Sequence, residues 1–154
     1  MWEKLRRFSA LDASAQKMFL RALVMLPVVS ASLKTLGFQA TKTALCILVS
    51  NPDLGLAAEV VKARIALAAH MVNSAGRYGI VRASCLAKSL TLWCLLGRQG
   101  IASQLRIGIR KEHGGFSAHA WVEREGAALN EPDDQHRHYA AFDEAFATLP
   151  QDES

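Results

Sequence analysis

The chain has 154 residues, of which 51% are hydrophobic and 21% are charged, with a formal net charge of +4. This length fits one domain with its own core, and the apolar content excludes a disordered chain. The positive charge is spread along the sequence, so no nucleic-acid-binding surface is expected, because that needs a concentrated basic patch. We expect a single domain over 1–154, with a helical region at 1–79 and a second region at 80–150.

The three cysteines, Cys46, Cys85 and Cys94, are widely and irregularly spaced. This spacing is typical neither of a disulfide framework nor of a zinc motif, so a reduced, cytoplasmic location is favoured. The five histidines show no ligand spacing, and we expect no metal ion and no cofactor. The most apolar stretch is interrupted by Arg21 and Pro27, so no transmembrane segment is expected.

The first half of the sequence predicts helices. Apolar residues recur at helical spacing over 12–36 and over 56–74. Pro27 indicates a kink or a break into two helices in the first stretch, and the segment 76–79 is expected to break the second. The run 44–49 is too short for periodicity to separate helix from strand, and Cys46 within it is expected to be a buried small hydrophobe.

The second half predicts one more helix and then strands. Ser84 is a good N-cap for an apolar helix that ends near 97–100. Three later stretches predict strands: 105–109, 116–123 and 127–131. Helices followed by strands indicate an α+β fold, with the helical N-terminal half packed on a small antiparallel sheet. We expect a loop at 132–138, which leaves His136 and His138 solvated, and a last short helix at 139–149.

One cysteine and one histidine occupy positions suited to nucleophilic catalysis. Cys85 falls in the first turn after the Ser84 cap, where free N–H groups and the helix dipole favour a thiolate. The same N–H groups are suited to hold an oxyanion. His119 lies on a later strand, where it is suited to act as the general base. Cys94 lies mid-helix and should be inert, while Trp121 either shields the pair from water or belongs to the core.

The residue that orients the histidine depends on the turn between the last two strands. A three-residue loop at 124–126 places Glu131 opposite His119. A two-residue turn at 125–126 instead places Asn130 diagonally beside it. Either side chain is able to orient the imidazole, and Glu131 is preferred.

Four segments together resemble a known family: Ser84–Leu90, Leu95–Ile101, Gly115–Glu123 and Gly126–Glu131. They are similar to the leader peptidases of lasso-peptide biosynthesis, whose protease domain is transglutaminase-like. The resemblance implies a transglutaminase-like or papain-like cysteine protease core with Cys85 as nucleophile and His119 as general base. The family usually has an aspartate as third member, and its place falls on Glu131.

The resemblance also implies a function and partners. It predicts a cytoplasmic cysteine peptidase that removes the leader from a ribosomally made precursor peptide. No leader-recognition domain fits before the helical region, so a separate recognition protein is the expected partner, and the lasso cyclase is a further candidate. Two other functions stay open: amide transfer to an amine by the same Cys/His pair, and a non-catalytic peptide-binding module with the same fold.

Overall fold

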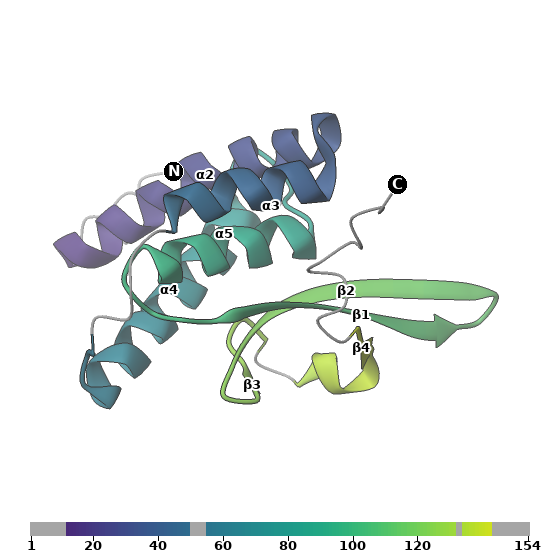
Figure 1. The fold of residues 1–154 in the computed structure, drawn as a ribbon. Coiled ribbons are helices and arrows are strands. Elements are labelled where there is room, and N and C mark those ends of the chain that lie inside the picture. The colour runs from purple at the N-terminus through teal and green to yellow at the C-terminus, as the bar shows by residue number, and fades with distance from the viewer. Residues whose placement is uncertain (1–11, 50–54, 132–133, 143–154) are drawn as a thin grey trace, which may run out of the picture.

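A computed structural model describes residues 12–49, 55–131 and 134–142 of the chain. Its helices come first and its strands follow (Figure 1). The elements are α2 (Ala13–Thr35), α3 (Gly37–Leu48), α4 (Ala58–Tyr78), α5 (Cys85–Gly97), β1 (Gln104–Glu112), β2 (Gly115–Arg124), β3 (Ala127–Ala128), the 3-10 helix η1 (Gln135–His138) and β4 (Ala140–Ala141). Helices α2, α3 and α5 lie on one side of the sheet and η1 lies on the other (Figure 1).

The strands form one antiparallel sheet in the order β3-β2-β1-β4. Its centre is the long hairpin of β1 and β2, in which Gly108 lies opposite His119. The two outer strands have only two residues each. The expected α+β fold with a small antiparallel sheet is confirmed.

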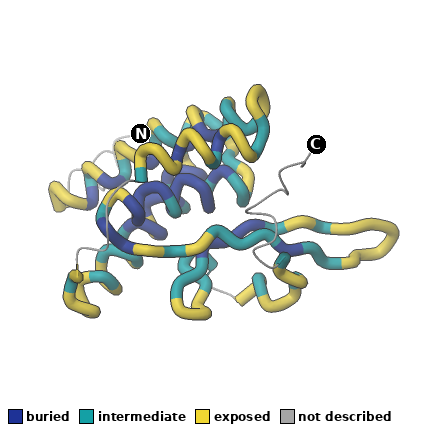
Figure 2. The backbone as a smooth tube through the Cα atoms, viewed as in Figure 1, coloured by how far each residue is buried: buried dark blue, intermediate teal, exposed yellow. Residues whose placement is uncertain are grey.

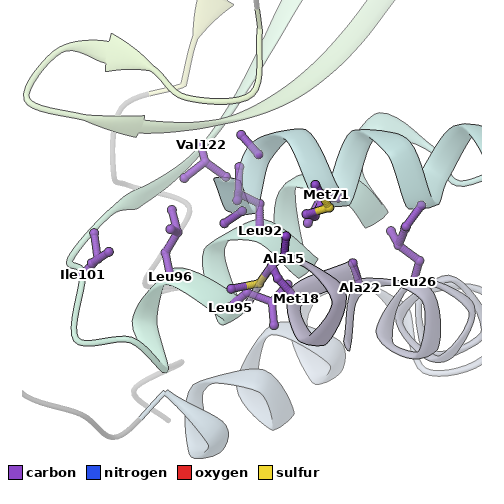
Figure 3. Close-up of a cluster of buried hydrophobic side chains, with 14 residues drawn as sticks. Ala15, Met18, Ala22, Leu26, Met71, Leu92, Leu95, Leu96, Ile101 and Val122 are labelled. Atoms are coloured by element: carbon purple, nitrogen blue, oxygen red, sulfur yellow. The ribbon is translucent and has the colours of Figure 1, made fainter. Parts of the chain in front are cut away.

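Helix α5 lies at the centre of the core. Most of its residues are buried, and the chain is dark blue along its length in Figure 2. Its leucines pack with side chains from α2, α4 and β2 (Figure 3). These residues include Met18, Leu26, Met71, Leu92, Leu95, Leu96 and Val122. Because burying one such side chain contributes about 1.5–3 kcal/mol, this packing fixes α5 firmly against the sheet.

Helix α2 continues through Pro27, whereas α4 ends where expected. Pro27 lies inside α2, where its neighbours Leu26 and Val29 are buried, so core packing outweighs the lost backbone hydrogen bond. Helix α4 includes Gly76 and ends at Tyr78, within the segment 76–79 that was expected to break it. A Cβ at Gly76 would come within 2.6 Å of Lys88 Cε, so this glycine permits close packing of α4 on α5.

The ambiguous run 44–49 belongs to α3, which ends at Leu48. The prediction that Cys46 is buried is wrong. The buried face of α3 is formed by Thr41 and Leu45, and Cys46 is turned about 100° away from Leu45 along the helix. It is therefore exposed.

The C-terminal elements also differ from expectation. The third strand stops at Ala128, and part of the predicted loop forms η1. The start of the predicted last helix is instead β4, because the open edge of β1 offers backbone partners. Ala140 pairs with Ile109, and the Phe142 N–H donates to the Ile107 carbonyl at 2.9 Å. Residues 143–149 of that predicted helix lie outside the described residues.

Within the described residues, α2 is the helix that is long and apolar enough to cross a membrane, by length and composition alone. The sequence led us to expect no such segment because of Arg21 and Pro27. Core helices of folded domains pass the same test, and one face of α2 packs in the core through Met18, Ala22 and Leu26.

Replacement of Gly97 by Ala should destabilise the fold. A Cβ there would collide with Val49 Cγ1 at the end of α3. Overpacking of this kind costs about 1–3 kcal/mol, which exceeds the gain of up to ~1 kcal/mol in helix propensity. Urea unfolding followed by circular dichroism measures the difference. Gly115→Ala is the matched control, since a Cβ at Gly115 meets nothing within 4 Å, and equal stability of the two variants would contradict the prediction.

Candidate active site

Cys85 is the first residue of α5, as predicted. Its neighbour Ser84 is the N-cap, and the Ser84 Oγ accepts a hydrogen bond from the Ala87 N–H at 3.2 Å. Cys85 is half-buried and carries a free thiol. The remaining N–H groups of the first turn and the helix dipole favour negative charge at this end of the helix.

The other two cysteines have different surroundings. Cys94 is fully buried, and this burial raises the pKa of its thiol. It is therefore held as a neutral thiol without access to a substrate, in agreement with the prediction that it is inert. Cys46 is exposed on α3, at the far side of α5 from the sheet.

A small polar network joins the helix of Cys85 to the strand of His119. Ser89, one turn after Cys85, donates its hydroxyl proton to the Ala120 carbonyl at 2.9 Å. Asn130 completes the network: its Nδ2 donates to Ser89 Oγ at 3.1 Å, and its Oδ1 accepts from the Val122 N–H at 2.9 Å. Because Ser89 and Ala120 adjoin the two candidate residues, these bonds hold the start of α5 against the His119 stretch of β2.

His119 is paired with a carboxylate. Its Nε2 is hydrogen-bonded to Glu131 Oε1, while Glu131 Oε2 accepts the backbone N–H of His136 at 2.8 Å. The Glu131 side chain is only 8% exposed. Both carboxylate oxygens of Glu131 therefore make hydrogen bonds. Because the side chain is poorly solvated, a charge-assisted hydrogen bond there is strong.

The route from the turn to this pair differs from the prediction. Arg124 pairs with Ala127, so residues 125 and 126 form a two-residue turn, with φ of 52° and 79°. The three-residue loop is therefore wrong, yet Glu131 and not Asn130 contacts His119. The reason is that the strand pairing ends early: the Asn130 side chain takes the place of a backbone acceptor for Val122, and the chain leaves the sheet there.

Two aromatic rings contact the imidazole, and a third packs on one of them. The Trp121 ring is stacked with His119 at 6.1 Å between centroids, and the Tyr139 ring lies at 5.1 Å. The His136 ring packs on Trp121 at 5.7 Å. Trp121 is buried, as expected of a core residue. Its role in shielding the Cys85–His119 pair from water stays a prediction.

The contacts of His136 were not predicted from the sequence. We expected it to be solvated in a polar loop, but its ring packs on Trp121 and its Nδ1 lies 3.7 Å from Glu131 Oε2. The prediction is wrong because η1 folds back over the sheet, and periodicity does not detect a helix of four residues. His138 is exposed, as expected.

Gly108 leaves room for these rings. It lies opposite His119 on β1, and a Cβ there would stand 3.0 Å from both the Trp121 ring and the Tyr139 Cβ. Any side chain at this position would push the aromatic cover away from His119.

Among the described residues, the structure thus brings His119 and Glu131 together and uses Asn130 as a brace. No hydrogen bond in that part of the chain links the Cys85 thiol to the His119 ring, so their pairing stays a prediction. The same residues include no group of three His, Cys, Asp or Glu side chains arranged to hold a metal ion. Since Glu131 occupies Nε2 of His119, the ring nitrogen left for proton exchange is Nδ1.

The structure thus combines an α+β fold, a thiol at a capped helix N-terminus and a histidine–carboxylate pair beside the sheet. A comparison with protein families matches residues 22–142 to the Transglutaminase-like superfamily. The chain belongs to this superfamily, which includes cysteine proteases and transferases. Comparisons with curated proteins and with solved structures gave no match.

Asn130→Ala should destabilise the protein by about 1–3 kcal/mol, because the Val122 N–H loses its acceptor and Ser89 loses a donor. Asn130→Asp keeps the acceptor alone and should fall between alanine and wild type. Thermal unfolding of the three proteins checks the order. Asn73→Ala is the matched control, since the Asn73 Nδ2 makes only a 3.5 Å contact with the Asn130 carbonyl, and an equal loss in both alanine variants would refute the brace.

Proposed function

We propose that the chain is a cysteine peptidase in which Cys85 is the nucleophile, His119 the general base and Glu131 the residue that orients it. The observation that carries the proposal is the His119–Glu131 pair on a strand braced to the capped helix that begins with Cys85. In enzymes, a thiol at a helix N-terminus is activated when it pairs with a histidine that a buried carboxylate orients. The pairing of Cys85 with His119 is part of the proposal.

The reaction has two stages. His119 Nδ1 takes the proton of the Cys85 thiol, and the thiolate attacks the peptide carbonyl, whose oxyanion is held by N–H groups of the first turn of α5. As the C–N bond breaks, His119 returns the proton to the departing amine and a thioester remains. Water then gives a proton to His119 and attacks the thioester carbon, which releases a carboxylic acid and restores the thiol.

Glu131 acts through His119 in this mechanism. Its bond to Nε2 fixes the tautomer that presents Nδ1 to the thiol, and its charge stabilises the imidazolium that forms after each proton transfer. The His136 N–H holds the second carboxylate oxygen, so Glu131 stays in place while the charge of the ring changes. The low exposure of Glu131 increases the strength of this electrostatic effect.

For the substrate we propose a ribosomally made lasso-peptide precursor, cut between leader and core in the cytoplasm. The support is the resemblance of four segments between 84 and 131 to leader peptidases of that pathway. A separate recognition protein would bring the leader to Cys85. The new core amine is the group that a cyclase needs, which makes the cyclase a further expected partner.

Cys85→Ala should abolish cleavage while leaving the fold intact, because the side chain is half-buried at a helix start and alanine suits a helix. Mass spectrometry of a candidate precursor, incubated with and without the recognition protein, gives the cut bond. Cys46→Ala is the control: its thiol is also free but lies on exposed α3, so activity should be unchanged. Cleavage by Cys85→Ala at the wild-type rate would contradict the assignment of Cys85 as the nucleophile.

The same spectra separate the other two functions. Amide transfer to an added amine gives a product heavier than the hydrolysed leader by the amine minus one water. If the chain is a non-catalytic binding module, the mass of the precursor stays unchanged after incubation with either the wild-type chain or Cys85→Ala.

Glu131→Gln should lower kcat/KM by roughly 10²- to 10⁴-fold, since the amide cannot stabilise an imidazolium as a carboxylate does. Glu131→Asp keeps the charge and should retain more activity than Gln. Steady-state cleavage rates measure both. Glu59→Gln, an exposed change in the first turn of α4, is the control, and a Glu131→Gln enzyme as fast as this control would show that Glu131 has no part in the reaction.

A further inference from the structure

The outer face of α2 carries an apolar ridge that the described part of the fold leaves uncovered. Leu20, Val24 and Val28 are 49%, 65% and 62% exposed. They follow one another at four-residue spacing, so they form one line along the helix. The opposite face of α2 is buried through Met18 and Ala22, and Figure 2 shows the alternation of buried and exposed segments along the helix.

More exposed apolar residues lie at the ends of α3, which packs beside α2 through the 2.8 Å hydrogen bond between Ser32 and Thr41. They are Leu36, Ile47 and Leu48. Six of the ten large exposed hydrophobic residues in the described part of the chain therefore belong to α2, α3 and their junction. A concentration of this kind on one layer of a fold marks a surface that binds something.

The charge of this layer has one sign. Helices α2 and α3 contain no Asp or Glu. They carry four basic residues: Lys17, Arg21, Lys34 and Lys42. Lys17 and Arg21 are exposed and lie on the same outward side of α2 as Val24. An outward helix face with apolar and basic residues but no acidic residue complements a surface that has anionic groups on its outside and an apolar layer beneath them.

We propose that the outer face of α2, with the adjoining ends of α3, binds the surface of an anionic lipid bilayer. The ridge lies on the exposed face of one helix, and such a face inserts its apolar side chains among lipid headgroups while its lysines and arginines meet lipid phosphates. The helix lies on the bilayer and does not cross it, because its other face forms the protein core.

The proposed lipid-binding face lies on the far side of α5 from the sheet. Helix α5 separates α2 and α3 from the sheet, and η1 lies on the other side of the sheet (Figure 1). The inference rests on the outer face of α2 and the ends of α3, and it does not depend on the proposed peptidase activity.

The test is co-sedimentation of the full chain with two kinds of vesicle. One contains phosphatidylcholine alone, and the other contains phosphatidylcholine with about 30 mol% phosphatidylglycerol. We expect binding to the anionic vesicles only, weakened by added salt. The double variant Val24→Ser/Val28→Ser should bind at least tenfold more weakly, and Lys17→Gln/Arg21→Gln should lose most of the preference for anionic lipid. Val60→Ser, an exposed change on α4, is the matched control and should bind as wild type.

Circular dichroism of each variant shows that it is folded, which is expected because every changed residue is exposed. Three results would overturn the proposal: no binding of the wild-type chain to anionic vesicles, equal binding to neutral vesicles, or undiminished binding by the folded Val24/Val28 variant. If that variant keeps its lipid binding but loses binding to the leader-recognition protein, the face is a protein-docking surface instead.

Discussion

The hydrogen bonds of Ser89 and Asn130 are the constraint on which the candidate site depends. Ser89 lies in the buried middle of α5, and Asn130 lies where the chain leaves β3, so two side chains connect helix, central strand and loop. Hydrophobic packing sets the distance between α5 and the sheet but allows sliding. The polar contacts fix the register, because a shift of one residue would leave a buried Val122 N–H without an acceptor.

The sequence predicted those elements whose signal is local. Helical spacing located α2 and α4, the Ser84 cap located the start of α5 to the residue, and alternation located the hairpin. The failures arose where tertiary contacts decide. Helix α2 is not broken at Pro27 because its neighbours Leu26 and Val29 pack in the core, and 140–141 forms a strand because β1 has a free edge. Both effects depend on contacts between segments distant in the sequence, so neither is visible from composition or periodicity.

The site shows the same division. Cys85, His119 and Glu131 were selected from the sequence, and the structure joins the last two. The turn that was meant to deliver Glu131 was wrong, since a side chain of Asn130 replaced the backbone in the ladder. His136 was missed altogether, because its contact with Glu131 is made by a backbone N–H, which every residue except proline has.

Part of the cover of the histidine is held by a short outer strand. Tyr139 precedes β4, which has two residues and is the last strand in the order β3-β2-β1-β4 formed by the described residues. Short edge segments with few buried contacts open with small free energies, well below that of global unfolding. Warming should therefore uncover the imidazole while the leucines of α5 are still packed, so that the temperature at which the site loses its order lies below the melting temperature of the core.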